Sequence, residues 1–115
     1  MLRIYHNPRC TKSREGLSIL EKSGKEYEVV KYLDNPPSYM ELCAIVGKLG
    51  IEGIDLVRKN EKIWKEKFKR KKLSDEEIIQ AMVDHPKLIE RPIVIWNNKA
   101  VIGRPPELIE DFIKD

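Results

Sequence analysis

The order of predicted elements indicates an α/β domain built around a mixed four-stranded sheet. Short β-rich runs lie near both ends of the chain, and apolar residues in the segment between them recur at helical spacing. With 115 residues the chain has about the length of one domain. We therefore predict a single domain over residues 1–115, in the order β-α-β, a helical insertion at about 38–85, then β-β-α.

The first third of the chain supplies a strand, a helix and a second strand. Residues 2–5 predict a strand that ends before a proline, because proline cannot continue a central ladder. Residues 11–21 contain good helix formers and predict a helix that stops at Gly24. Residues 27–33 alternate apolar and charged side chains as a strand does, and Pro36 breaks this run.

Two capping boxes mark the helices of the middle segment. Ser38 stands three residues before Glu41, and Ser74 stands three residues before Glu77. In this pattern each side chain binds a free backbone N–H of the other residue at a helix start. Residues 51–73 lie between the two predicted helices and are expected to form short helices.

The last third predicts a β-hairpin followed by a helix. Residues 92–96 and 99–102 are β-rich, and residues 97–98, both Asn, suit a two-residue turn. Residues 105–113 open with proline and predict a helix that buries Leu108. This order, with a cysteine just after the first strand and a proline opening the third, is the thioredoxin-like pattern.

Cys10 is the candidate nucleophile. It lies where the first strand connects to the first helix, and the free N–H groups of a helix start favour an anion. Arg9, Lys12 and Arg14 crowd the same turn, so the pKa of the thiol is expected below its ordinary value of about 8.5. Ser13 stands where a Cys-x-x-Cys motif has its second cysteine. An oxidised or adducted Cys10 therefore needs a thiol from outside the loop.

The second cysteine and the two histidines give weaker indications of function. Cys43 falls beside the apolar stripe of the helix after Ser38, and it is expected to be a small buried residue. His6 lies four residues before Cys10. It is expected to be either a proton acceptor or charge partner of the thiolate, or a strand-end histidine that hydrogen-bonds to a loop. Two cysteines and two histidines do not form a four-ligand zinc site, so no metal is expected.

Two arginines are predicted to face each other at the open end of the hairpin. If residues 97–98 form the turn, the residue numbers of any two cross-strand partners add up to 195. This register sets Arg91 opposite Arg104. Like charges directly across a ladder repel each other, so this pairing makes sense if an oxyanion lies between the two guanidinium groups. The alternative is two solvated arginines in a slipped register.

Composition and charge limit the classes of function. Apolar residues make up 41% and charged residues 36%, no apolar run approaches the roughly 20 residues of a membrane span, and the first residues are too polar for a signal peptide. A cytoplasmic protein without membrane contact is the expectation. Residues 58–72 hold nine Lys/Arg against two Glu within a net charge of +3. We predict a solvated surface there, anchored by Trp64 and Phe68, without sequence-specific nucleic-acid binding.

Seven stretches between residue 4 and about residue 112 match one enzyme family in order and spacing. They are His6-Asn7-Pro8-Arg9-Cys10, Ser13-Arg14, Tyr32-Leu33 with Pro36-Pro37, Arg58-Lys59-Asn60, His85-Pro86 with Leu88-Ile89, Arg91-Pro92-Ile93-Val94, and Gly103-Arg104-Pro105-Pro106-Glu107. On these stretches the sequence resembles the glutathione- and glutaredoxin-coupled arsenate reductases. The resemblance implies reduction of arsenate to arsenite by a monomer without a bound cofactor, with glutathione as co-substrate and glutaredoxin as partner.

The resemblance also implies roles for individual residues. Cys10 is implied to attack arsenate and to form a covalent bond to arsenic, with its pKa lowered by His6. The peptide bond before Pro92 is implied to be cis. The implied ligands of the oxyanion are Arg58, Arg91 and Arg104. The implied supporting residues are Asn7, Ser13 and Arg14.

The sequence departs from this family in two places. Thr11-Lys12 stands where the best-characterised members have Gly-Thr, and their C-terminal extension is missing. The same fold includes the Spx-type regulators, which bind RNA polymerase and typically carry Cys-x-x-Cys. Ser13 and the three arginines argue against that class, while the basic residues 58–72 keep an interaction role open. The alternative is thus an Spx-like or other thioredoxin-fold redox or regulatory protein.

Overall fold

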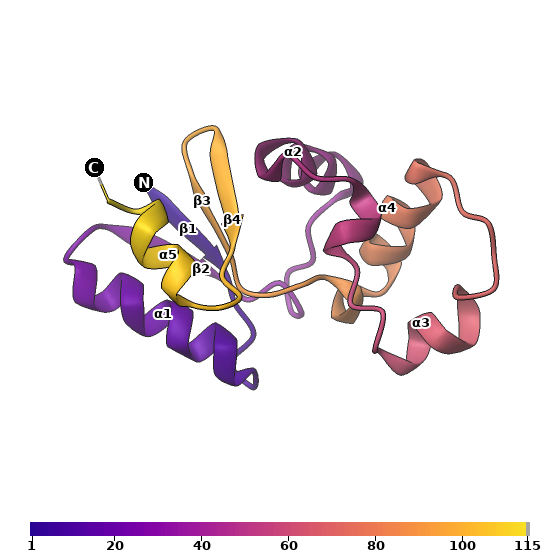
Figure 1. Ribbon diagram of the computed structural model, residues 1–115, viewed down its shortest axis with the longest axis horizontal. Helices are drawn as coiled ribbons and strands as arrows, with labels where there is room; N and C mark the ends of the chain where they lie inside the picture. The colour runs from indigo at the N-terminus through magenta and orange to yellow at the C-terminus, as the bar shows by residue number, and fades with distance from the viewer. Residues whose placement is uncertain (115) are drawn as a thin grey trace. The chain divides into compact units, whose positions relative to one another are not determined.

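The computed structural model describes residues 1–114 (Figure 1). The chain divides into two compact units: a sheet unit of Met1–Asn35 with Arg91–Asp115, and a helical unit of Pro36–Glu90. In the described part of the chain, no helix is long and apolar enough to cross a membrane. The organisation of residues 1–115 as one domain stays a prediction.

The sheet unit contains the predicted mixed four-stranded sheet. Its strands are β1 (Leu2–Tyr5), β2 (Tyr27–Val30), β3 (Ile93–Trp96) and β4 (Lys99–Ile102). The spatial order is β2-β1-β3-β4, with β1 parallel to β2 and antiparallel to β3, and β3 antiparallel to β4. The α/β prediction is confirmed, and the sheet edge where β1 ends carries the segment with Cys10.

Two helices pack on one face of this sheet, α1 (Thr11–Ser23) and α5 (Glu107–Phe112) (Figure 1). Side chains pointing to one face of β1 and β3 meet residues of both helices in a single apolar core. Its buried members are Leu2, Ile4, Leu20, Val94, Ile109 and Ile113. Burying such side chains contributes about 1.5 to 3 kcal/mol each. This core therefore fixes the start of α1 relative to the hairpin.

Two details of the sheet unit differ from the sequence prediction. β2 ends at Val30 rather than at residue 33, because the chain turns there and the N–H groups of Asp34 and Asn35 both donate to the Lys31 carbonyl. Leu108 in α5 was predicted to be buried, but it is 41% exposed. The neighbouring Ile109 is buried in its place. The predicted end of α1 is confirmed, with Gly24 in the left-handed conformation.

The helical unit holds the two capped helices and three short helical segments. Both capping boxes are confirmed: Ser38 Oγ accepts from the Glu41 N–H at 3.1 Å, and Ser74 Oγ accepts from the Glu77 N–H at 3.2 Å. The elements are α2 (Tyr39–Leu49), η1 (Gly53–Leu56), α3 (Lys62–Lys67), α4 (Asp75–Asp84) and η2 (Pro86–Leu88). The short helices predicted within residues 51–73 are thus present.

The basic segment of residues 58–72 is anchored as predicted. Trp64 is buried, and its ring stacks on that of Phe68 with centroids 5.5 Å apart. The helix within this segment, α3, covers only residues 62–67, and the lysines of the segment are exposed. Both aromatic rings of the segment are thus engaged in packing, and the absence of sequence-specific nucleic-acid binding stays a prediction.

Cys43 is exposed, so the expectation that it is a buried core residue is wrong. Leu42 and Ile45 are the buried residues of α2. Successive residues of a helix point about 100° apart, because 3.6 residues make one turn. Cys43 therefore follows a buried residue and lies outside the narrow stripe that packs against the rest of the unit.

Gly103 is expected to tolerate no side chain. A Cβ at this position would lie 2.5 Å from Ile109 Cδ1 and 3.0 Å from Pro92 Cγ, and Ile109 is fully buried. We expect Gly103→Ala to lower the free energy of unfolding by about 1 to 3 kcal/mol, measured by urea denaturation. The matched control is Gly47→Ala in α2, where no atom lies within 4 Å and alanine should stabilise the helix by about 0.5 to 1 kcal/mol. Equal losses in both variants would contradict the packing argument.

Candidate active site

Cys10 is the N-cap residue of α1, in the connection that leaves β1. Its extended backbone (φ −96°, ψ 122°) ends a short turn in which its N–H donates to the Asn7 carbonyl at 3.0 Å. Its own carbonyl accepts from the Arg14 N–H and so begins the helix. The first turn of α1 contains no acidic residue. The thiol therefore lies at the positive end of the helix dipole, where a thiolate is favoured.

Three buried polar residues hold this turn together. Ser13 Oγ accepts from the Asn7 N–H at 2.9 Å and lies 2.7 Å from His6 Nδ1. The side chain of Asn7 in turn accepts from the Arg9 N–H at 3.0 Å. His6, Asn7 and Ser13 are all buried. The structure thus brings the predicted supporting residues Asn7 and Ser13 into one network with His6.

Burial favours the uncharged form of His6. Desolvation lowers its pKa below the ordinary value of 6.5, a hydrogen bond with the Ser13 backbone opposes this, and the charges of Lys31 and Arg14 lower the pKa further. Since Ser13 Oγ already accepts from Asn7, its hydroxyl proton is available to the unprotonated Nδ1 of a neutral imidazole. His6 thus contacts the hydroxyl of Ser13, and its implied part in lowering the pKa of the thiol stays a prediction.

The surroundings of Cys10 favour its thiolate. Partial burial by itself raises the pKa of the thiol, but the Ser13 N–H, the Arg91 guanidinium and the Lys12 N–H outweigh it, so the pKa lies below its ordinary value. Opposite charge and donated hydrogen bonds both stabilise the charged form of such a group. The thiol is also accessible to small molecules, because the residue is only partly buried.

The hairpin register predicted from the 195 sum is confirmed. Trp96 pairs with Lys99 and Val94 with Val101. The ladder continues to the open end, where the Gly103 N–H donates to the Pro92 carbonyl at 2.8 Å. The peptide bond before Pro92 is cis, as the resemblance implied, and so is the bond before Pro105.

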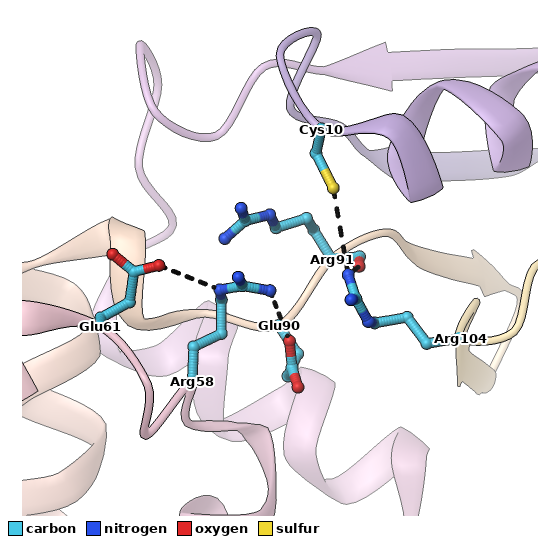
Figure 2. A network of polar contacts seen from close by, with 6 residues as sticks. All are labelled: Cys10, Arg58, Glu61, Glu90, Arg91 and Arg104. Carbon is cyan, nitrogen blue, oxygen red and sulfur yellow. Dashed lines mark hydrogen bonds and ion pairs between the residues drawn. The ribbon is translucent and has the colours of Figure 1, made fainter.

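The two arginines at the open end of the hairpin meet at the thiol. Arg104 Nη1 lies 4.0 Å from Cys10 Sγ and donates to the Arg91 carbonyl at 3.2 Å. The Nε of Arg91 is buried and has no hydrogen-bond partner among residues 1–114. Figure 2 shows the Cys10 side chain pointing toward both arginines. Two guanidinium groups beside a thiol of lowered pKa are an arrangement that suits an oxyanion, and its binding here stays a prediction.

Arg14 closes the cysteine turn from the outside. Its Nη1 donates to the Pro8 carbonyl at 2.8 Å, and its Nη2 donates to Thr11 Oγ1 at 3.2 Å. Thr11 is one of the positions at which the sequence departs from the family it resembles, and its hydroxyl serves here as an acceptor that fixes Arg14. Sequence reasoning gave Thr11 no role, because a hydroxyl three residues before an arginine is no signal by itself.

Arg58 lies in the helical unit and is neutralised by two carboxylates. Its Nη1 lies 3.0 Å from Glu90 Oε1 and its Nε lies 3.3 Å from Glu61 Oε2 (Figure 2). The backbone supports this arrangement, because the Arg58 N–H donates to the Leu88 carbonyl at 2.7 Å. Arg58 was named only through the family resemblance, and neither carboxylate was predicted. That Arg58 binds the same oxyanion as Arg91 stays a prediction.

Ser13→Ala is expected to destabilise the protein by about 1 to 3 kcal/mol, because the Asn7 N–H would be left buried without its acceptor. Thermal or urea unfolding measures this, and Ser18→Ala on the same helix is the control with no expected loss. A Ser13→Ala variant as stable as the parent would show that the network is not structural.

The pH dependence of stability should reflect His6. Its pKa is lowered in the folded protein, so the unfolded chain takes up a proton more readily at low pH. The free energy of unfolding should therefore decrease as the pH drops below about 6.5.

Comparison with known proteins places this geometry in a family. The model of the ArsC family matches residues 5–112. The chain is 48% identical over 114 residues to the uncharacterized protein YfgD of Escherichia coli K12, covering 97% of this chain and 96% of that one. It is 47% identical over 111 residues to the arsenate reductase of Neisseria meningitidis, covering 95% of each.

A solved structure shows the same fold. The arsenate reductase of Vibrio cholerae superposes with a TM-score of 0.93 at 45% identity, covering 97% of both chains. The predicted thioredoxin-like α/β fold is thereby confirmed. The match of the family model to nearly the whole chain, the relatives and the shared fold agree that this chain belongs to the ArsC family.

Proposed function

We propose that this protein is an arsenate reductase in which Cys10 bonds covalently to arsenic and glutathione and glutaredoxin provide the electrons. One observation carries the proposal: a thiol of lowered pKa lies 4.0 Å from Arg104 Nη1, beside an Arg91 whose buried Nε has no hydrogen-bond partner among residues 1–114. Relatives named as arsenate reductases support the choice of arsenate as the oxyanion.

The proposed reaction begins with attack of the Cys10 thiolate on As(V). An S–As bond forms, and one oxygen leaves as water after two protons are taken up. The glutathione thiol then displaces a second oxygen as water, so that arsenic carries two sulfur atoms. A glutaredoxin thiolate then attacks the glutathione sulfur, so that a new S–S bond forms and the bond between glutathione sulfur and arsenic breaks. The electron pair of the broken bond stays on arsenic, which becomes As(III). Water replaces the Cys10 sulfur, and arsenite leaves.

The site supports an external source of thiols. Ser13 occupies the position of a second cysteine in the loop, and Cys43 belongs to the other unit. A reducing cytoplasm provides glutathione and keeps such thiols free, so the proposal includes a cytoplasmic monomer without a bound cofactor. Arg58 is proposed as a third arginine for the oxyanion on the resemblance alone. Arg91 and Arg104 would stabilise the charge that develops on the arsenate oxygens.

Steady-state formation of arsenite tests the proposed function. We expect turnover with arsenate, glutathione and glutaredoxin together, and its loss when any one of them is omitted. Replacement of glutaredoxin by thioredoxin tests the choice of partner. The outcome that would contradict the proposal is the absence of arsenite combined with retention of the protein on purified RNA polymerase at physiological salt, which the Spx-like alternative predicts.

A further inference from the structure

A cavity of the sheet unit borders the cysteine turn. It has a volume of about 310 Å³ and is lined by residues 6–9, from the turn after β1, and by Lys31, Leu33 and Asp34, from the turn after β2. Cavities that bind small molecules begin at about 300 Å³. Neither Arg91 nor Arg104 lines this cavity, so it is distinct from the arginine pair at the hairpin.

The charged side chains of this cavity have no ion-pair partner among residues 1–114. Arg9, Lys31 and Asp34 are exposed, and none of the three side chains forms an ion pair with another residue in the range 1–114. Lys31 and the buried His6 both line the cavity, and the charge of Lys31 lowers the pKa of the His6 ring. The cavity therefore offers two cations and one carboxylate to a ligand.

We propose that this cavity binds glutathione through its terminal groups, with Arg9 and Lys31 holding the two carboxylates and Asp34 holding the ammonium. At neutral pH glutathione carries two carboxylates and one ammonium, which is the inverse of the charge set of the cavity. Charge-assisted hydrogen bonds of this kind are about twice as strong as neutral ones. The inference rests on the proposed function for the use of glutathione, and adds where and how it is held.

Arg9 connects the cavity to the nucleophile, because it lines the cavity and immediately precedes Cys10 in the chain. An extended tripeptide spans roughly 10 Å, at about 3.3 to 3.6 Å per residue. In the proposal, the terminal groups of glutathione lie at Arg9 and Lys31, and its central thiol attacks the arsenic that is bound to Cys10. Arsenate remains with Arg91 and Arg104, so the two substrates use different cations.

Binding of S-methylglutathione, which has no free thiol, tests the inference without any turnover. Calorimetry with the full chain should show binding to the parent, weakened roughly 10- to 150-fold in Arg9→Ala and in Lys31→Ala, the effect of one lost charge-assisted bond of about 1.5 to 3 kcal/mol. Lys99→Ala, an exposed lysine of β4 in the same unit, is the matched control and should bind like the parent. Asp34→Asn should weaken binding of S-methylglutathione but not of its analogue without the amino group.

Kinetics with the same variants separates this inference from the proposed function. The KM for glutathione should rise in Arg9→Ala and Lys31→Ala by a larger factor than the KM for arsenate. Equal affinity for S-methylglutathione in all variants, no binding to the parent, or an equal rise of both KM values would overturn the cavity assignment even if arsenate is reduced. Selective loss of binding in a protein that does not reduce arsenate would support the cavity and refute the proposed function.

Discussion

Cys10→Ser should reduce arsenate turnover by on the order of 10⁴-fold or more, because removal of the nucleophile of a covalent mechanism leaves only the contribution of binding. A serine hydroxyl has a far higher pKa than a thiol, so the favourable surroundings of Cys10 do not ionise it. Arsenite formation measures the effect. Cys43→Ser is the matched control: Cys43 is exposed on α2, and its change should alter neither activity nor stability appreciably.

Alkylation of Cys10 by iodoacetamide as a function of pH tests the cause of its reactivity. The thiolate is the reacting form, and its pKa is lowered, so the rate should reach half its maximum at a pH below that of an ordinary thiol. In Arg91→Ala this midpoint should move up, because a cation that favours the thiolate is gone. Turnover that survives Cys10→Ser, or a Cys10 that titrates near 8.5, would refute its role as nucleophile.

Arg91→Ala and Arg104→Ala should each lower kcat/KM for arsenate by roughly 10- to 150-fold. Each guanidinium is expected to give the oxyanion a charge-assisted hydrogen bond of about 1.5 to 3 kcal/mol. The Arg91 Nε is a buried donor without a partner among residues 1–114, and the Arg104 Nη1 lies beside the reacting sulfur. Lysine at either position should restore activity only in part, since it keeps the charge and loses the planar fork of donors.

Protection by sulfate gives a readout of the same site that needs no catalysis. Sulfate, as a mimic of arsenate, should slow alkylation of Cys10 in the parent and less so in Arg91→Ala or Arg104→Ala. Arg70→Ala, an exposed arginine of the basic segment, is the control that should be protected like the parent. Equal protection of Cys10 in all four proteins would show that the two arginines do not share an anion with it.

Local sequence signals predicted much of the fold because their interactions lie within a few residues of each other. The capping boxes at Ser38 and Ser74 and the end of α1 at Gly24 each depend on one turn of helix. The hairpin register follows from a two-residue turn and the period-two alternation of strands, so it placed Arg91 and Arg104 together. Cys10 could be identified because a thiol just before a helix meets that helix's free N–H groups whatever the rest of the chain does.

Tertiary packing decided the features for which the sequence carried no local signal. Which side of α2 is buried depends on its neighbours in the helical unit, and those neighbours left Cys43 exposed. β2 ended early because the turn at Lys31 closes there, which also created the cavity beside His6. The choice of Glu90 as a partner for Arg58 joins residues 32 positions apart. Contacts of that sequence separation form only when the chain has folded, since burial and loop closure, not local propensity, determine which side chains meet.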